Sequence, residues 1–356
     1  MNLYKSTPRN ILVLSRYDSL GASSRVRIFQ YLPYLESNIN FTVSPFFSNR
    51  IINDLYNNKK RSIVLLFISY FRRFKILLSI FKYDIVWIEK EIFPFFPGFL
   101  EMLFIPKRTK YFLDYDDAIF HNYDFDNNFI LKLILKNKFE KIIGRADKVF
   151  VGNQYLYDYA NRWNKNVFYL YSVVNENIYR NLNKQNANKF TIGWIGSPST
   201  TKYLQEIIYY INQIPKRDKI RLITIGASNL INANFDLVQL EWKLEDEVDY
   251  INLFDVGIMP LQDNNWEKGK CGFKLIQYMA CSLPVIASPI GINKEIVSGD
   301  VGFLAKDKNE WIDAILLLME NSDIRKSFGI NGRKKIEKNF SFFNNVKILS
   351  SSFNFS

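Results

Sequence analysis

The stretch Lys268–Gly291, KGKCGFKLIQYMACSLPVIASPIG, joins a basic loop, a helix pattern and a buried-strand pattern in one run. Three lysines surround the two glycines of its loop. Apolar residues from 273 to 281 recur at helical spacing, and residues 284–287 (PVIA) predict a short buried strand. A helix that starts after glycine exposes backbone N–H groups and the positive end of its dipole. The loop therefore predicts an anion site, although a solvated basic loop before an ordinary helix fits the same residues.

The same alternation of apolar strand, polar loop and helix opens both halves of the chain. Residues 10–15 (NILVLS) predict a buried strand, followed by a loop with Gly21 and a helix over 25–35. Residues 190–195 restart the pattern, and the loop GSPSTTK leads into a second helix. Further strands are expected at 84–89, 111–115, 148–152, 167–174, 221–225, 238–242 and 255–260. This succession predicts an α/β fold with doubly wound sheets.

Length and composition predict two domains, each large enough for its own core. The chain has 356 residues, of which 48% are hydrophobic and 23% charged, as in a globular protein. The Asn- and Lys-rich segment 175–189 predicts the joint between the domains. We therefore expect a first domain over residues 1–180 and a second domain over residues 186–336.

The segment from 255 to 305 resembles the donor site of the family 4 glycosyltransferases, most closely in the run KCGFKLIQYMA. The resemblance implies a GT-B fold, in which two Rossmann-like domains face each other across a cleft. It also implies that the C-terminal tail, about 337–356, packs back on the first domain. The family pattern has two glutamates in this segment, where the chain has Gly269 and Gln277. Gln277 is accordingly expected to bind ribose hydroxyls as a neutral amide and to tolerate replacement by Glu.

A donor site follows from the resemblance and from the two glycine loops. Lys274 and Lys202, with the backbone from Gly272 to Leu275, are expected to bind the donor diphosphate. The loop after residue 195 has a second explanation, because Ser and Thr before a helix often serve only as N-caps. The complete set of expected donor-binding residues is Gly21, Arg25, Gly196, Ser197, Ser199, Lys202, Trp242, Lys270, Gly272, Phe273, Lys274, Leu275 and Gln277.

Polar residues follow two predicted strands of the first domain. Glu91 comes after the strand 84–89, while Asp116, Asp117 and His121 come after the strand 111–115. Ligands gather at the carboxyl ends of parallel strands, so these four residues are the candidate catalytic groups. A lone histidine is more often structural, and that alternative stays open for His121. Asp114, Asp116 and Asp117 also have the composition of a metal site, but the resemblance implies that no metal or other cofactor is needed.

The first half of the chain is basic and contains a long apolar helix pattern. Residues 1–180 hold 26 Lys and Arg against 16 Asp and Glu, which indicates an anionic partner. In the segment 61–82, basic residues including Arg61, Arg72 and Lys75 fall on one stripe, and Arg72, Arg73 and Lys75 together are expected to dominate any recruitment to an anionic membrane. The segment is either a core helix with one wet edge or a helix lying in the surface of an anionic membrane.

These observations and the resemblance favour a glycosyltransferase, which moves a sugar from a nucleotide-sugar donor to a glycan or lipid-linked acceptor in bacterial surface polysaccharide or lipopolysaccharide synthesis. Retention of configuration is implied by the resemblance alone. Neither a signal peptide nor a membrane-spanning run is apparent, which predicts a cytoplasmic protein bound peripherally to the inner face of the cytoplasmic membrane. Two alternatives remain: a nucleotide-sugar epimerase on the same fold, and a non-catalytic basic nucleic-acid-binding protein. The second lacks any recognisable binding module in the sequence, so a nucleic-acid partner is not expected.

Overall fold

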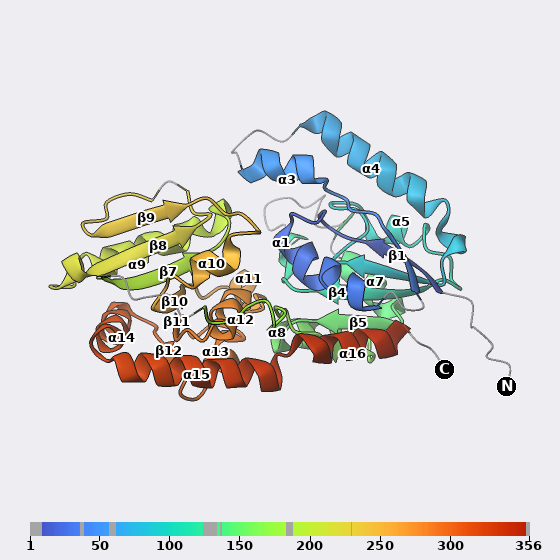
Figure 1. Ribbon diagram of the computed structural model, residues 1–356. Coiled ribbons are helices and arrows are strands. Elements are labelled where there is room, and N and C mark those ends of the chain that lie inside the picture. The colour runs from blue at the N-terminus through green and yellow to red at the C-terminus, as the bar shows by residue number, and fades with distance from the viewer. Residues whose placement is uncertain are drawn as a thin grey trace, which may run out of the picture. The chain divides into compact units, whose positions relative to one another are not determined.

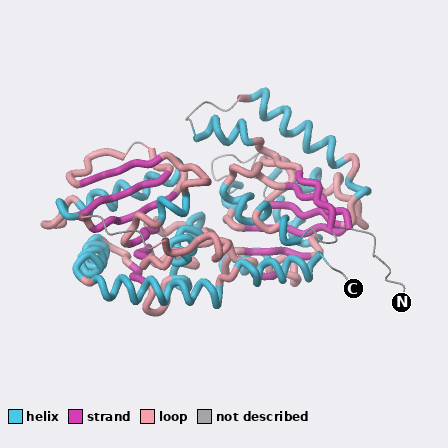
Figure 2. The backbone as a smooth tube through the Cα atoms, viewed as in Figure 1, coloured by secondary structure: helices cyan, strands magenta, loops and turns pink. Residues whose placement is uncertain are grey.

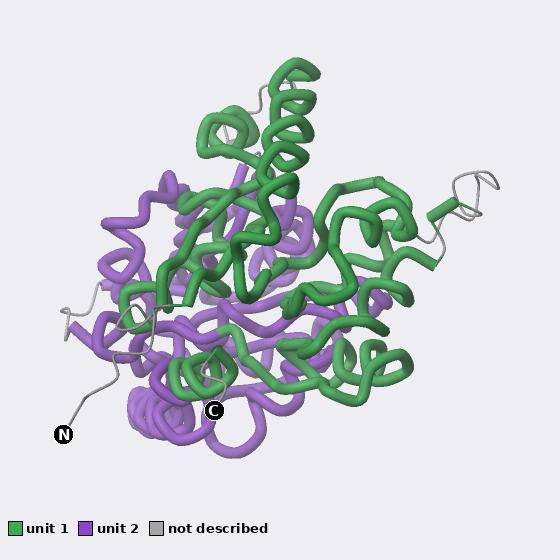
Figure 3. Tube along the Cα trace, turned by 90° about the vertical axis from the view of Figure 1, so that its right-hand side faces the viewer, with its two compact units in different colours: residues 1–172, 345–356 green, residues 173–344 purple. Residues whose placement is uncertain are grey.

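The computed structural model describes residues 9–35, 39–56, 62–123, 134–135, 137–182, 188–228 and 230–353. The chain divides into two compact units (Figure 3). Unit 1 comprises residues 1–172 and 345–356, and unit 2 comprises residues 173–344. The sequence predicts that the first domain ends at 180 and the second begins at 186, which is later in the chain than the observed boundary between 172 and 173. It predicts that the C-terminal tail begins at about 337, which is earlier than the observed return to unit 1 at 345.

Unit 1 is built on a six-stranded parallel sheet with the order β2-β1-β3-β4-β5-β6. Its central strands are buried along nearly their whole length, as expected when helices cover both faces of a parallel sheet. The strands are β1 (Arg9–Leu14), β2 (Ile39–Val43), β3 (Ile85–Glu89), β4 (Lys110–Tyr115), β5 (Lys148–Val151) and β6 (Val167–Tyr169).

Helices of different lengths surround this sheet (Figure 1). The C-terminal helix α16 (Phe342–Phe353) packs on it, and the Phe353 ring lies 5.6 Å from that of Phe112 and 5.4 Å from that of Trp87. The other helical segments are α1 (Ala22–Ser24), the π-helix η1 (Arg25–Phe29), α2 (Leu32–Leu35), α3 (Asn49–Tyr56), α4 (Ile63–Leu77), η3 (Ile80–Lys82), α5 (Gly98–Glu101), η4 (Ile119–Tyr123), α7 (Lys138–Arg145) and α8 (Gln154–Ala160).

Unit 2 contains a second parallel sheet of six strands, in the order β12-β11-β10-β7-β8-β9 (Figure 2). Its core is almost entirely aliphatic and aromatic, with Trp194, Ile208 and Trp311 among its buried members. The strands are β7 (Phe190–Ile195), β8 (Ile220–Ile225), β9 (Asp236–Leu240), β10 (Val256–Met259), β11 (Val285–Ala287) and β12 (Gly302–Leu304). The helical segments are η5 (Pro198–Tyr203), α9 (Leu204–Ile211), η6 (Arg217–Lys219), α10 (Glu247–Ile251), α11 (Asn265–Lys268), α12 (Phe273–Ala280), α13 (Asn293–Ile296), α14 (Lys308–Glu320) and α15 (Ser322–Asn339).

Each sheet has one point where the strand order reverses. In unit 1 it lies between β1 and β3, and in unit 2 it lies between β7 and β10. Loops that leave neighbouring strands in opposite directions separate at such a point, and the crevice beyond the carboxyl ends is where open α/β sheets bind ligands. The residues that follow these four strands are therefore the first place to search for a site.

The α/β class with doubly wound parallel sheets is confirmed, and every strand expected from the sequence is present. The strand expected over 167–174 is shorter, because β6 ends at Tyr169. The helix expected over 25–35 is divided into η1 and α2, and the one expected over 61–82 is interrupted after Leu77. β2 and β12 were not expected: β2 is half-exposed and polar at alternate positions, and β12 has only three residues.

Candidate functional site

The start of α12 depends on Gly272, which adopts a left-handed backbone conformation with φ of 65°. A Cβ at this position would lie 2.3 Å from Cδ1 of Ile296. Glycine is therefore required both for the conformation and for the close approach of the neighbouring helix α13. The helix begins immediately afterwards at Phe273, as the sequence predicts.

Tyr278 fixes the position of α12 against the sheet. Its hydroxyl oxygen accepts a hydrogen bond of 3.0 Å from the backbone N–H of Ile195, the last residue of β7. Gly257 in β10 leaves room for the Tyr278 ring, since a Cβ there would lie 2.2 Å from a ring carbon. The second turn of α12 is thus held close to the end of β7, at the point where the strand order reverses.

The loop after β7 and the basic stretch before α12 are joined through one side-chain contact. Tyr203, beside Lys202, donates a hydrogen bond from its hydroxyl to the buried carboxylate of Glu267. Within the loop, the hydroxyl oxygens of Ser197 and Ser199 lie 2.9 Å apart. The two loops that the sequence singled out as anion sites therefore lie next to each other.

The lysines of these loops lie over aromatic rings of unit 2. Lys274 Nζ is 5.6 Å from the ring centroid of the buried Trp194, and Lys270 Nζ is 5.6 Å from that of Trp266. Lys202 Nζ is 5.0 Å from the ring centroid of Tyr203. These contacts limit the freedom of the three ammonium groups and keep them near the loops. Gly196, between Trp194 and the two serines, has no space for a Cβ, which would lie 2.4 Å from the Trp194 ring.

Glu247 is a buried carboxylate that accepts hydrogen bonds from three side chains of unit 2, two of them distant in sequence. It accepts hydrogen bonds from Gln277 Nε2 at 2.7 Å, from Trp242 Nε1 at 2.5 Å and from the Tyr179 hydroxyl. Trp242, an expected donor-binding residue, and Gln277, which is expected to bind the ribose, are thus parts of one cluster. Sequence reasoning missed Glu247, because nothing distinguishes it from Glu241, Glu245 and Asp246 in the same acidic run.

In unit 1 the chain turns sharply at the end of β3. Lys90 has a φ of 66°, which is a strained conformation for a lysine, and the N–H of Glu91 donates to the carbonyl oxygen of Glu89 at 2.8 Å. This turn sends Lys90 across to β4, where its Nζ lies 2.9 Å from Asp116 and 3.3 Å from Asp117. Burial opposes a charge on Lys90, but the two aspartates outweigh it and raise the pKa of this lysine.

Glu91 turns inward rather than toward solvent. Its carboxylate pairs with Arg16 and with Lys138 at 2.7 Å, and it accepts a hydrogen bond from the Tyr123 hydroxyl. The side chain is 1% exposed, and both of its oxygens are engaged by these partners. The sequence proposed Glu91 as a catalytic group, whereas its contacts are those of a residue that holds the end of β3 in place.

The other candidate catalytic residues are partly accessible. The side chains of Asp116 and Asp117 are 12% and 23% exposed, and His121 Nε2 lies 2.8 Å from the Tyr155 hydroxyl. Asp114, by contrast, is buried and accepts a 2.7 Å hydrogen bond from Arg27 Nε. Burial raises the pKa of Asp114 to about 6, although Arg27 acts against it. Asp114 pairs with Arg27, whereas Asp116 and Asp117 share Lys90, and the described residues contain no cluster of His, Cys, Asp or Glu that could hold a metal ion.

The first loop of unit 1 leads from β1 into the π-helix. The N–H of Arg25 donates to the carbonyl oxygen of Gly21 at 2.9 Å, and a Cβ on Gly21 would lie 2.2 Å from Cβ of Tyr17. Arg25, like Gly21, therefore lies on a tightly packed turn after β1. This turn belongs to unit 1, whereas the remaining expected donor-binding residues belong to unit 2.

Helix α4 presents an apolar outer face, which we define as Ile63, Val64, Phe67, Ile68, Phe71, Phe74 and Leu78. Ile63, Phe67 and Phe71 expose between 70% and 72% of their surface. These positions recur every three or four residues and so fall on one face of the helix. The ribbon of α4 lies on the outside of unit 1 (Figure 1). Contiguous apolar surfaces of this kind mark interaction sites. The sequence-based alternative of a core helix with one wet edge is not what the structure has.

The basic residues of α4 do not share one surface, which corrects the expectation that Arg72, Arg73 and Lys75 act together in membrane recruitment. Arg73 is buried and donates hydrogen bonds to the carbonyl oxygens of Ser15, Ser44 and Ile92. Burial, with Arg72 nearby, lowers its pKa to about 9. Arg72 and Lys75 are exposed, and Arg61 lies outside the described residues. Between residues 62 and 110 the exposed charged side chains are Arg72, Lys75, Lys82, Asp84, Lys107, Arg108 and Lys110.

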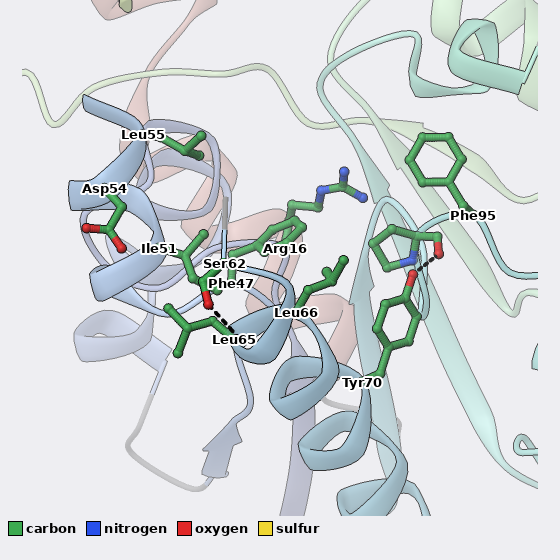
Figure 4. Close-up of a pocket in the computed structure, with 11 residues that line it drawn as sticks. Arg16, Phe47, Ile51, Asp54, Leu55, Ser62, Leu65, Leu66, Tyr70 and Phe95 are labelled. Carbon is green, nitrogen blue, oxygen red and sulfur yellow. Dashed lines mark hydrogen bonds between the residues drawn. The ribbon is translucent and has the colours of Figure 1, made fainter. Parts of the chain in front are cut away.

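A pocket of about 120 Å³ lies within unit 1 between α3, α4 and the segment after β3 (Figure 4). Its walls are mostly apolar, with Ile51 from α3, Leu66 and Tyr70 from α4, and Phe95 on the opposite side. Arg16, the partner of Glu91, supplies its guanidinium to the lining. The pocket therefore combines apolar walls with one cation close to the ionic cluster at the end of β3.

Comparison with solved structures identifies the architecture. Anabaena HepE in complex with UDP-glucose superimposes with a TM-score of 0.71 over 97% of this chain and 99% of that chain, at 14% sequence identity. The fold is GT-B. At this level of identity the likeness concerns the fold alone. The two Rossmann-like domains of the GT-B fold correspond to the two parallel sheets of units 1 and 2.

Sequence comparisons find group 1 glycosyl transferases through the second GT-B domain. Residues 189–321 match the model of the group 1 glycosyl transferases. An uncharacterized glycosyltransferase of Methanocaldococcus jannaschii is 27% identical over 45% of this chain, and the match spans 44% of that relative. The capsular polysaccharide biosynthesis glycosyltransferase CapM of Staphylococcus aureus is 24% identical over 43% of each chain. The matches thus span less than half the length of these two relatives.

The site residues of the GT-B protein therefore form two groups. The domain that matches the glycosyl transferase model holds the joined glycine loops, their lysines and the Glu247 cluster. The other domain holds the ionic cluster around Lys90, the pocket and the outer face of α4. No helix of the described residues is both long and apolar enough to span a membrane.

Proposed function

We propose that the protein is a glycosyltransferase that moves a sugar from a nucleotide-sugar donor to an acceptor, with retention of configuration as in family 4. The main support is the geometry at the strand-order reversal of unit 2, where Lys274 in the first turn of α12 lies over Trp194 of β7, and Tyr203 joins the loop after β7 to Glu267 before α12. This geometry lies within the region that matches the group 1 glycosyl transferases. Backbone N–H groups at a helix start, with lysines beside them, suit a diphosphate.

The diphosphate is the leaving group of the reaction, so its binding contributes directly to catalysis. Negative charge increases on the phosphate as the bond to the sugar breaks, and preorganised donors stabilise that charge. Lys274, Lys270 and Lys202 would supply the cations, and the backbone from Gly272 to Leu275 would supply N–H donors. Gly196, Ser197 and Ser199 would contact the phosphates from the loop after β7. The reaction as proposed requires no metal or other cofactor.

The Glu247 cluster would bind the nucleoside. Gln277 donates to Glu247 through its amide nitrogen, and this contact would orient the amide oxygen of Gln277 as the acceptor for a ribose hydroxyl. Trp242 is held by the same carboxylate and would contact the base. In this arrangement Gln277 performs the role of the family glutamate with an amide oxygen, and Glu247 fixes its orientation.

Unit 1 would bind the acceptor. Asp116 and Asp117 are the accessible carboxylates at the end of β4, and they would accept hydrogen bonds from the acceptor hydroxyls. His121 lies on the segment that follows and would contact the sugar or its phosphates. Gly21 and Arg25, on the turn after β1, would complete this side of the site.

The acceptor would be lipid-linked, and the protein would work at the inner face of the cytoplasmic membrane in surface polysaccharide or lipopolysaccharide synthesis. The outer face of α4 is apolar, and six of the seven exposed charged residues between 62 and 110 are basic. An apolar stripe with basic flanks suits an anionic lipid surface. The pocket beside α4 would accommodate an apolar part of the acceptor. A second copy of the chain would cover the apolar face but would not explain the basic flanks.

A donor panel followed by a transfer assay tests this proposal. Thermal shift with UDP-, GDP-, ADP- and CMP-sugars should reveal one nucleotide class that stabilises the protein, because a ligand that binds only the folded chain raises its stability. The sugar label of that donor should then appear in a lipid extract from membranes. Conversion of the donor to a second soluble nucleotide sugar, without any acceptor, would instead establish an epimerase.

A further inference from the structure

Ser23 touches two carboxyl groups with one hydroxyl. Its Oγ lies 2.8 Å from Glu89 Oε1 and 2.6 Å from Asp116 Oδ2. A serine hydroxyl has a single hydrogen to donate, so it can satisfy only one of these two oxygens. Two oxygens at such a distance with no hydrogen between them repel each other. The second contact therefore requires a proton on one of the two carboxyl groups.

The surroundings of Glu89 show which of its oxygens is available for a proton. Glu89 Oε2 accepts the N–H of Arg16 at 2.7 Å and the hydroxyl of Ser24. The Ser24 oxygen itself accepts the N–H of Tyr17 at 2.8 Å, so its single hydrogen is directed to Glu89. Oε2 is thus an acceptor twice over, and Oε1, which faces Ser23, is the oxygen that can carry a hydrogen.

The surroundings of the two carboxyl groups differ in charge and in burial. Asp116 Oδ1 lies 2.9 Å from Lys90 Nζ, and the Asp116 side chain is 12% exposed, so its charge is balanced and partly solvated. Glu89 is fully buried. Burial raises its pKa and Asp116 adds to this, while Lys90 acts in the opposite direction. Asp114 on β4 and Arg73 on α4 are the other charged groups that face it.

We propose that Glu89 carries a proton and donates it in a hydrogen bond to Ser23, and that Ser23 donates in turn to Asp116. The buried acid and the serine then act as positioning residues, which keep the Asp116 carboxylate charged and in one orientation at the end of β4. Through this chain Asp116 presents a fixed acceptor to a hydroxyl group of the sugar acceptor. The role of Asp116 rests on the proposed function, whereas the protonation of Glu89 does not.

The pH dependence of stability tests the protonation directly. The folded chain would hold this proton more tightly than the unfolded chain, in which glutamate has a pKa of about 4.3. Above that pH the unfolded state therefore binds fewer protons, and the contribution of Glu89 to stability declines as the pH rises toward its folded pKa. Glu89→Gln mimics the neutral acid, because its amide can donate to Ser23 and its oxygen can accept from Arg16 and Ser24.

The measurement is the free energy of unfolding of wild type and of Glu89→Gln, from about pH 4.3, the pKa of glutamate in the unfolded chain, upward to the folded pKa of Glu89. Wild type should lose stability relative to Glu89→Gln as the pH rises, and the two proteins should be closest at the acid end. A difference that does not change with pH, or one in which wild type gains with rising pH, would show that Glu89 is not protonated. The comparison uses no substrate, so it stands whether or not sugar transfer is found.

A second measurement covers the case in which Glu89→Gln does not fold. In wild type labelled with ¹³C at the glutamate carboxyl carbons, the resonance of Glu89 is the one displaced by Ser23→Ala. It should titrate above the ordinary range of glutamate, and a titration within that range would overturn the proposal. If sugar transfer is also found, Ser23→Ala should raise the KM for the acceptor far more than that for the donor. An equal effect on both substrates would contradict the positioning role.

Discussion

The amide nitrogen of Gln277 donates a 2.7 Å hydrogen bond to the buried carboxylate of Glu247. The two residues are 30 positions apart, on α12 and α10, and Trp242 and Tyr179 bind the same carboxylate. A neutral amide is therefore the partner that this carboxylate requires. Gln277 stands where the family 4 pattern has a glutamate, and its amide is matched here by the carboxylate of Glu247. It is therefore one member of an amide–carboxylate pair and not an isolated departure from that pattern.

This pair reverses the expectation that Gln277→Glu is tolerated. The substitution would bring a second carboxylate to the place of the amide, next to Glu247, where both side chains are buried. Two such groups cannot both ionise, and one pKa rises by about one to three units, which costs roughly 1.4 to 4 kcal/mol at neutral pH. Urea unfolding should show this loss at pH 7 and a smaller one at pH 5, where the added proton is easier to hold.

A reciprocal exchange provides the control. Glu247→Gln combined with Gln277→Glu keeps one carboxylate and one amide in the pair, so it should recover most of the stability that the single change removes. Unchanged stability of the single variant at pH 7 would mean that the two side chains separate easily, and the proposed orientation of Gln277 would then be wrong.

The lysine at the start of α12 should contribute to donor binding. Lys274→Ala is expected to weaken the binding of the nucleoside diphosphate by about 1.5 to 3 kcal/mol, the usual range for hydrogen bonds to charged groups. Lys216→Ala is the matched control, because Lys216 is a lysine of the same unit that pairs with Glu320 on the surface. Calorimetry on both folded variants measures the difference, and equal affinities would remove Lys274 from the site.

The buried strands could be predicted because each is a nearly continuous apolar run. β7 and β8 are buried along almost all of their length, so their sequences leave little choice of structure. β2 was missed because its burial alternates at the edge of the sheet, where polar residues reach solvent. The basic loop before α12 was predictable because glycine and lysine before a helical pattern indicate its local geometry.

Residues that act through distant partners could not be predicted. Glu247 is chosen among several acidic neighbours only by tertiary contacts with Gln277 and Trp242. The sequence likewise gives no reason to separate Arg73 from Arg72, although one is buried against three carbonyl oxygens and the other is exposed. How much of a helix is buried depends on how the whole domain packs around it. The local periodicity of the sequence does not specify that packing.

Lys138 should be essential for the stability of unit 1. Its Nζ lies 2.7 Å from Glu91 and 3.0 Å from Glu101, and all three side chains are buried. Lys138→Met would leave both carboxylates without this cation, and breaking a buried pair in this way costs about 3 to 5 kcal/mol. Lys141→Met on the same helix removes an exposed lysine and should cost about 1 kcal/mol or less. Thermal unfolding of the two variants should differ clearly, and similar values would contradict the central role of Lys138.

The loss caused by Lys138→Met should also depend on pH. Burial raises the pKa of Glu101 to about 7 even though Lys138 acts against it. Without Lys138 the folded chain would hold a proton on this carboxyl more tightly still, so the variant should lose stability as the pH rises. Its deficit relative to wild type should therefore be smaller at pH 5 than at pH 8, whereas a deficit caused only by lost packing would not change.

Membrane binding should separate into an apolar part and an electrostatic part. Phe67→Ser with Phe71→Ser removes two large side chains from the outer face of α4 without disturbing buried contacts, and should reduce co-sedimentation with anionic vesicles at any salt concentration. Arg72→Gln with Lys75→Gln should weaken binding by about 1 kcal/mol for each charge at low salt and by less at high salt. Arg73 is not a suitable target, because its replacement would remove three hydrogen bonds to buried carbonyl oxygens and so destabilise the fold itself.

Ile330→Ser is the control for the apolar part, since Ile330 is an exposed residue of α15 in unit 2, remote in sequence from α4. It should leave vesicle binding unchanged, and all three variants should bind the donor nucleotide as wild type does, because the donor loops belong to unit 2. Negligible pelleting of wild type with both anionic and neutral vesicles would contradict the membrane proposal. Sedimentation equilibrium would then show whether a second copy of the chain covers the outer face of α4.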